Sequence, residues 1–242
     1  MGAMKGKADV WDVVNEPFDN HDILDRLGPD AMPGWFRRVK GIDPKATLVL
    51  NDYPPLDGAA TDNAHLNSFY DHLKALKASG APLEGIGFQG HIGGTPVPPE
   101  GVLSGLDRFA KLGLPIEITE FDINTQDRDF QARYLRDFLT AVFSHPSVTG
   151  FTQWGFWAKR HWLPDGALYD ADWTIRPHGR MYLDLVKKQW WTRAKGATAK
   201  DGTYRTRGFY GDYAVVVTAP GRAPRSVKMS LAPKGSPLIV RL

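Results

Sequence analysis

From residue 8 onward, short apolar runs rich in β-branched and aromatic residues alternate with longer segments of helical period. The runs, which we predict to be strands, are 8–14, 47–51, 85–89, 116–119 and 149–154. Helices are predicted over 31–41, 61–79, 99–112, 127–144 and 177–188. Regular alternation of strands and helices predicts parallel βαβ units.

Five such units are too few to close an eight-stranded barrel, which takes about 250 residues by itself. The sequence therefore fits either a short open α/β sheet or the later part of a barrel. We predict an α/β fold, an incomplete (β/α)8 TIM-type barrel of about five βα units with a small all-β C-terminal module. Such a barrel leaves two long parallel edges exposed.

Beyond residue 188 the pattern changes to short β-prone runs with no helix among them. Turn signals lie at 200–202 and 219–221, and the β-prone runs are 203–206, 208–212, 213–218, 226–231 and 238–242. We predict a small antiparallel β module over residues 190–242 and the partial barrel over 4–189. Residues 1–3 read as a cloning scar.

The net charge of +3 hides an asymmetry along the chain. Residues 186–242 hold 12 Lys and Arg against 2 Asp and Glu, a net +10, whereas the rest holds 18 against 25, a net −7. The first interpretation of this C-terminal positive charge is a solvated basic face. The more specific one is attraction to an acidic polysaccharide or another polyanion. No recognised nucleic-acid motif accompanies the basic tail, so we predict no nucleic-acid partner.

The apolar runs are only of strand length, so we predict no membrane-spanning segment. The absence of cysteine excludes disulfides and thiolate metal sites. The histidines are scattered and form no zinc-binding helix motif, so we predict neither a metal nor a cofactor.

Each predicted strand ends in polar side chains, and these are the most informative residues of the chain. The strands end in Asn15-Glu16, Asn51-Asp52-Tyr53, Gln89-Gly90-His91, Glu120-Phe121-Asp122 and Gln153-Trp154. Active sites of parallel barrels lie at the carboxyl ends of the strands. Amide, carboxylate, imidazole and indole groups repeated there predict a pocket that holds a polyol.

Two of these residues suit the cleavage of a glycosidic bond. Retaining cleavage needs an acid for the leaving oxygen and a carboxylate nucleophile about 5–5.5 Å away, and Glu16 and Glu120 are the candidates. Taken singly, a glutamate at a strand end is more often a surface ion pair, and a lone histidine or tryptophan is more often structural. We interpret Glu117 as structural and expect it to point away from the barrel lumen.

The segments Trp11-Asp12-Val13-Val14-Asn15-Glu16 and Ile118-Thr119-Glu120-Phe121-Asp122-Ile123 resemble the two active-site signatures of glycoside hydrolase family 10, the endo-β-1,4-xylanases. Between them, 50–53 and 85–91 are similar to strands five and six of that barrel. Trp154-Gly155, Trp162 and Arg176-Pro177 are similar to strand eight and the loop that follows it. The resemblance covers about residues 5–190.

The resemblance implies a retaining endo-glycosidase that hydrolyses β-1,4-xylosidic bonds in xylan or a related β-1,4-linked polysaccharide. It makes Glu16 the general acid/base and Glu120 the nucleophile. The substrate-binding side chains it implies are Asn15, Gln89, His91, Trp154 and Trp162. Asn15 would bind the sugar 2-hydroxyl, His91 would hold Glu120, and Gln89 would orient Glu16. Asp122 and Asn51 would support these side chains from behind.

The chain departs from the family's pattern because nothing in it corresponds to the first three strands of the barrel. The alternative is therefore a catalytically impaired half-barrel that binds glycan, or one that needs a second chain to complete it. A homodimer through the exposed barrel edges is one such arrangement. We expect the parent protein to be secreted or periplasmic, and this sequence shows no signal peptide.

The C-terminal module has a weaker likeness, to transthyretin-like domains of the carboxypeptidase-regulatory type. The likeness rests on 201–204 and 208–213. Its aromatic residues are Tyr204, Phe209, Tyr210 and Tyr213, and they form either a core or a sugar-binding face.

Overall fold

The computed structural model describes residues 2–58 and 63–241, and it divides the chain into two compact units, 1–181 and 182–242. The first two residues of the helix predicted at 61–79, and Met1 of the predicted scar, lie outside the described residues. Gly2–Met4 forms a short 3₁₀ turn. No helix among the described residues is long and apolar enough to cross a membrane.

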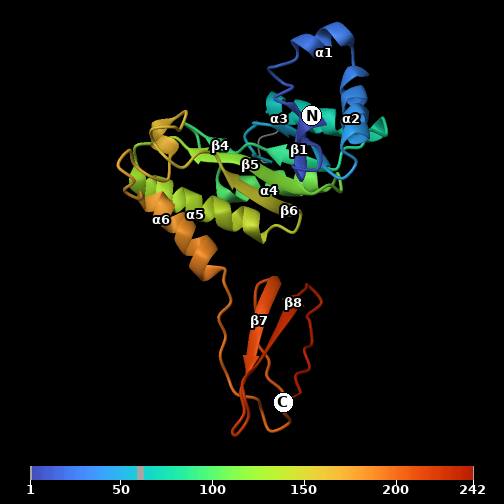
Figure 1. The fold of residues 1–242 in the computed structure, drawn as a ribbon. Helices are drawn as coiled ribbons and strands as arrows, with labels where there is room; N and C mark the ends of the chain where they lie inside the picture. The colour runs from blue at the N-terminus through green and yellow to red at the C-terminus, as the bar shows by residue number, and fades with distance from the viewer. Residues whose placement is uncertain (1, 59–62, 242) are drawn as a thin grey trace. The chain divides into compact units, whose positions relative to one another are not determined.

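The first unit is a parallel sheet with helices on one face, as the alternation predicted (Figure 1). Its strands are β1 (Val10–Asn15), β2 (Thr47–Asp52), β3 (Gly85–Phe88), β4 (His91–Ile92), β5 (Ile116–Ile123) and β6 (Val148–Gln153). They run in the order β1-β2-β3-β5, with β6 and β4 both pairing β5, and every pairing is parallel. The α/β prediction of an incomplete barrel is confirmed.

The helices of this unit follow the predicted segments closely. They are α1 (Asp22–Leu27), α2 (Ala31–Ile42), α3 (Ala64–Ala78), α4 (Pro99–Ala110), α5 (Arg128–Ser144) and α6 (Pro177–Asp184). Side-chain caps explain two of the starts, because Asn63 accepts from the Leu66 amide and Asp127 accepts from the Phe130 amide, each at 2.9 Å. The sequence analysis missed α1 and the two-residue strand β4.

The helix-covered face of the sheet is the apolar core. Ile86 and Phe88 of β3 and Ile118 of β5 are almost fully buried there. The Phe88 ring meets Phe69 of α3 edge-on at 5.2 Å between centroids and Phe109 of α4 at 4.8 Å. Burial of this apolar surface stabilises the unit.

The opposite face of the sheet is polar, and Glu117 lies on it. Side chains alternate along a strand, so Glu117 shares a face with Thr119, which donates a 2.7 Å hydrogen bond to Asn51. The Glu117 side chain also lies against Gly150, where an added Cβ would meet it at 3.1 Å. The expectation that Glu117 points away from the lumen is therefore wrong, because its neighbours Ile116 and Ile118 face the helices instead.

The second unit contains less β structure than the sequence predicted. Its sheet is a hairpin of β7 (Gly211–Val217) and β8 (Arg225–Leu231), paired antiparallel over their full length. The runs at 203–206 and 238–241 do not form strands, so the sheet has two strands where the sequence has five β-prone runs. The helix predicted at 177–188 ends at Asp184 and continues as a π-helical turn, Leu185–Gln189.

Candidate active site

Three amide side chains connect Glu16, just beyond β1, to Glu120, near the end of β5. Gln89 donates through Nε2 to Glu16 Oε1 at 2.8 Å and to Asn15 Oδ1 at 3.1 Å. Asn51 donates through Nδ2 to the same Asn15 oxygen at 2.9 Å and to Glu120 Oε1 at 3.0 Å. Of the predicted site residues, Asn15, Gln89 and Asn51 therefore lie with both glutamates in one continuous network.

Asn51 is the best-fixed member of this network. It is fully buried in β2, and Thr119 Oγ1 donates to its Oδ1 at 2.7 Å, which directs its NH₂ group toward Glu120. Gly87 of β3 leaves the space that Asn51 occupies, because an added Cβ there would lie 2.4 Å from Asn51 Oδ1. Sequence reasoning placed Asn51 but missed Thr119 and Gly87. The alternation of side chains along β5 and β3 was the signal that could have found them.

On the other side of Glu120, His91 joins it to a buried carboxylate. His91 Nε2 lies 3.6 Å from Glu120 Oε2, and His91 Nδ1 lies 3.0 Å from Asp122 Oδ1. Asp122 also accepts a 2.7 Å hydrogen bond from Trp162 Nε1, and its Oδ2 lies 3.7 Å from the buried His161. Asp122 thus lies beside His91 and holds one of the tryptophans, and its predicted support of His91 stays a prediction. His161 was not predicted.

The two tryptophans stand at the open side of the site. Trp154 and Trp162 are 44% and 59% exposed, and their rings lie 6.4 and 5.0 Å from the His91 ring. Large indole faces that remain open to solvent beside a polar network can pack against the C–H faces of a sugar ring. Both residues therefore lie where the sequence analysis placed them.

The chain beyond Trp162 is fixed by Arg176, whose guanidinium is buried. It donates to Asp170 Oδ1 at 2.7 Å and to the main-chain oxygens of Pro164 and Ala167 at 2.7 and 2.9 Å. A buried guanidinium with its donors satisfied in this way fixes the path of the loop that carries Trp162.

Glu16 has an unusual backbone. Its φ is 56°, in the left-handed region that residues other than glycine rarely adopt. Such a conformation costs about 1–3 kcal/mol and tends to persist at functional sites. Asn20 donates through Nδ2 to Glu16 Oε2 at 2.9 Å and through its main-chain amide to the Glu16 carbonyl at 2.9 Å. Asn20 was not predicted, and it completes the contacts of the Glu16 carboxylate.

Burial raises the pKa of Glu120 above its usual value of 4.5. His91 and the Asn51 hydrogen bond oppose this rise, whereas the charges of Asp12 and Glu16 add to it. Burial, and then the charge of Asp12, also raise the pKa of Glu117. Asp12, Glu117 and Glu120 thus share the lumen-facing side of the sheet.

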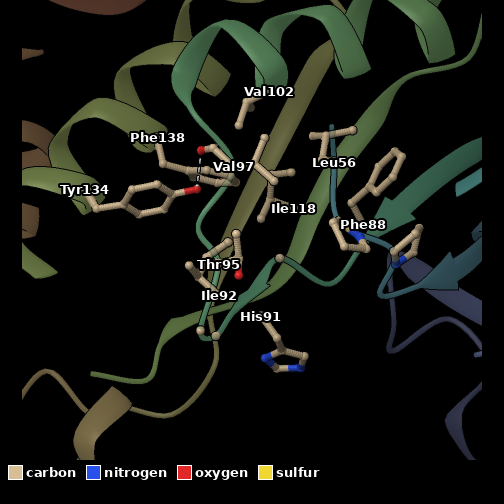
Figure 2. Close-up of a pocket in the computed structure, with 15 residues that line it drawn as sticks. Leu56, Phe88, His91, Ile92, Thr95, Val97, Val102, Ile118, Tyr134 and Phe138 are labelled. Carbon is tan, nitrogen blue, oxygen red and sulfur yellow. Dashed lines mark hydrogen bonds between the residues drawn. The ribbon is translucent and has the colours of Figure 1, made fainter. Parts of the chain in front are cut away.

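An apolar cavity of about 180 Å³ lies behind the site, between the sheet and α4 and α5 (Figure 2). Leu56, Val97, Ile118 and Phe138 line it, and the His91 ring points away from them. Neither Glu16 nor Glu120 lines this cavity, so it is not the place where a sugar meets the carboxylates. Among the described residues, no group of three or more His, Asp or Glu is placed to hold a metal ion.

The half-barrel sheet and the polar network at the carboxyl ends of its strands are consistent with a glycoside hydrolase. Glycosyl hydrolase family 10 matches residues 1–183, and the chain belongs to that family. The predicted resemblance is thereby confirmed for the barrel, and it is not confirmed for the C-terminal module.

Named relatives agree with this assignment. Endo-1,4-beta-xylanase 1 of Arabidopsis thaliana is 36% identical over 88% of this chain and 22% of its own length. Anti-sigma-I factor RsgI6 of Acetivibrio thermocellus is 36% identical over 96% of this chain and 30% of its own length. The chain thus spans less than a third of these two curated relatives.

Solved structures match the fold. Xylanase 10B from Thermotoga petrophila RKU-1, in complex with xylobiose, is 31% identical with a TM-score of 0.69. The match covers 78% of this chain and 62% of that one. Xylanase 10B from Thermotoga maritima is 30% identical with a TM-score of 0.67, over 78% and 63%.

Proposed function

We propose that this protein hydrolyses β-1,4-xylosidic bonds in xylan with retention of configuration, using Glu16 as the general acid/base and Glu120 as the nucleophile. The observation that carries the proposal is the amide network. Gln89 donates to Glu16, Asn51 donates to Glu120, and both donate to the side-chain oxygen of Asn15. The family and the relatives named endo-1,4-beta-xylanase support xylan as the substrate.

The proposed reaction has two displacements. In the first, Glu120 attacks the anomeric carbon while Glu16 gives its proton to the leaving oxygen, which forms a glycosyl-enzyme ester. In the second, water attacks the same carbon while Glu16 takes a proton from it, and Glu120 leaves as a carboxylate. Glu16 ends protonated, ready for the next turnover.

The surrounding side chains suit these steps. The Asn51 hydrogen bond and His91 both favour the ionised form of Glu120 that attack requires. Asn15 and Gln89 offer amide groups to sugar hydroxyls, and Trp154 and Trp162 offer ring faces. No step needs a cofactor.

The experiment measures reducing ends released from soluble xylan, with proton NMR of the first anomer formed. We expect the β-anomer first, and a fall of about 10³-fold or more in Glu120→Gln and in Glu16→Gln. Glu100→Gln, an exposed carboxylate in the first turn of α4, is the matched control and keeps the parent rate. A folded parent protein that releases no reducing ends would contradict the proposal, and an α-anomer first would contradict retention.

The alternative tested at the same time is glycan binding without turnover. One relative is named an anti-sigma-I factor and not a hydrolase, and among the described residues β1 pairs with no strand on its outer edge. Calorimetry with xylo-oligosaccharides that shows binding by a protein without activity would support this alternative. Solution mass by light scattering tests the predicted homodimer, and a monomer would contradict it.

A further inference from the structure

The loop between β6 and α6 carries an aromatic surface that the candidate active site does not use. Phe156 and Trp173 are 57% and 55% exposed. Trp173 stacks on Trp157 with centroids 4.8 Å apart and planes 10° apart, and the Phe156 ring lies 6.2 Å from the Trp173 ring. The exposed faces of Phe156 and Trp173 form what we call the Phe156–Trp173 platform.

The platform is held in place by main-chain contacts. The Tyr169 amide donates to the Phe156 carbonyl at 2.8 Å, and the Ala158 amide donates to the Tyr169 carbonyl at 3.0 Å. Trp157, beneath the platform, donates through Nε1 to the Ala171 carbonyl at 3.2 Å. The two rings are therefore presented by an ordered loop, so little conformational entropy would be lost when a ligand covers them.

Trp173 occupies a conformation that is unfavourable for a bulky residue. Its φ is 70°, within a tight turn in which its amide donates to the Asp170 carbonyl at 3.0 Å and the Asp170 amide donates to the Thr174 carbonyl at 2.9 Å. Glycine adopts this conformation without strain. A strained tryptophan that leaves more than half of its surface exposed indicates a use for the ring.

We propose that the Phe156–Trp173 platform binds xylose rings of a β-1,4-linked chain beyond those held between Glu16 and Glu120. This inference rests on the proposed function. Phe156 lies two residues after Trp154, whose ring meets the His91 ring edge-on at 6.4 Å between centroids, so one loop carries both the exposed ring beside His91 and the platform. Xylopyranose has no exocyclic hydroxymethyl group, and its flat C–H faces pack well on aromatic rings.

The test compares ligands of two lengths. Calorimetry is done on the full chain in the Glu120→Gln background, with xylobiose as the short ligand and xylohexaose as the long one. Trp173→Gly removes the ring, and glycine adopts the positive φ of this position without strain. Weaker binding in this variant therefore does not come from added backbone strain. We expect it to weaken xylohexaose binding about tenfold, with the change for xylobiose below about twofold.

Two further variants sharpen the test. Trp173→Phe keeps an aromatic face and should recover most of the xylohexaose affinity. Phe143→Ala removes a ring near the end of α5 that is 48% exposed, and this variant should bind both ligands as the parent does.

The outcomes separate this inference from the proposed function. Equal xylohexaose affinity in the parent and in Trp173→Gly overturns the platform, as does an equal loss for both ligands. A selective loss in the Glu120→Gln background, together with no release of reducing ends by the protein that keeps Glu120, supports the platform and contradicts hydrolysis. A parent protein that binds neither ligand overturns both proposals.

Discussion

The two faces of the parallel sheet are stabilised by different interactions. On the helix-covered face, Ile86, Phe88 and Ile118 are buried among aromatic rings from the helices. On the lumen-facing side, Asn51 and Glu117 lie among glycines and other polar groups. One face is stabilised by apolar burial and the other by a few directed hydrogen bonds. Substitutions on the two faces should therefore separate stability from activity.

The largest effect is expected on the helix-covered face. Phe88→Ala leaves a cavity against Phe69 and Phe109 and should lower the free energy of unfolding by about 3–5 kcal/mol, measured by guanidinium denaturation. The exposed Phe143→Ala is the matched control, with a change below about 0.5 kcal/mol. Where Phe88→Ala is still folded, its kcat should remain within about tenfold of the parent's, because the Phe88 ring packs against the helices and the amide network lies on the other face of the sheet. A loss of activity without a loss of stability would contradict the division between the faces.

The next effect is expected on the lumen-facing side. Gly87→Ala puts a methyl group where Asn51 lies, so Asn51 must move and the hydrogen bond to Glu120 is lost or lengthened. A displacement of about 1 Å at a catalytic group can cost about 100-fold in rate, and we expect a loss of that size in kcat on xylan.

Gly41→Ala is the same chemical change on the exposed side of α2, where an added Cβ meets nothing within 4 Å. It should keep the parent's activity and raise stability slightly, because alanine favours a helix more than glycine does. Parent-like kcat in Gly87→Ala would show that the position of Asn51 does not matter to the reaction.

The sequence revealed the site better than it revealed the packing around it. Glu16, Gln89, His91 and Glu120 each follow a recognisable apolar run, so their positions at the carboxyl ends of the strands could be predicted. Alternation along β5 and β3 is enough to put Thr119 and Gly87 on the lumen-facing side, but their contacts with Asn51 depend on the register between strands, which the sequence does not state.

In the C-terminal unit, by contrast, the sequence predicted β structure that does not form. Its short β-prone runs carry local propensity, but propensity alone does not decide which runs pair. Within the described part of this unit, which ends at residue 241, 211–217 and 225–231 form the one ladder. The prediction at 203–206 failed because no second sheet face is present there for that run to pack against.

A smaller effect on the lumen-facing side tests the pKa of Glu120. Thr119→Val removes the hydrogen bond that orients Asn51, and the Asn51 hydrogen bond lowers the pKa of Glu120. Its loss should raise that pKa further, so the acid limb of kcat/KM should move to higher pH, with a fall of about two- to tenfold below the optimum.

The pH profile of kcat/KM checks this prediction. Thr140→Val, which removes an exposed hydroxyl that donates to the Arg136 carbonyl on α5, is the isosteric control and should leave the limb where it is. An acid limb that moves to lower pH in Thr119→Val would reverse the assignment of Asn51 as a donor to the ionised Glu120.

The smallest effect is expected at Glu117, where the change is in stability and depends on pH. Burial and Asp12 raise the pKa of Glu117 in the folded chain above its usual value of 4.5. Between the usual and the raised pKa the folded state holds more protons than the unfolded state, so this carboxyl lowers stability as pH rises through that interval. Glu117→Gln removes the penalty, and its gain in stability over the parent should be absent well below pH 4.5 and complete at neutral pH.

Guanidinium midpoints of the parent and Glu117→Gln, measured from pH 3.5 to about 8, give this difference directly. Glu100→Gln, at the first turn of α4, should instead lose a little stability at neutral pH, since a negative charge there favours the helix. Because Glu117 is not part of the amide network, kcat in Glu117→Gln should stay within about twofold of the parent's. A stability gain that is greatest in acid would mean that Glu117 is held ionised in the folded chain and that the lumen-facing side carries a cation partner for it.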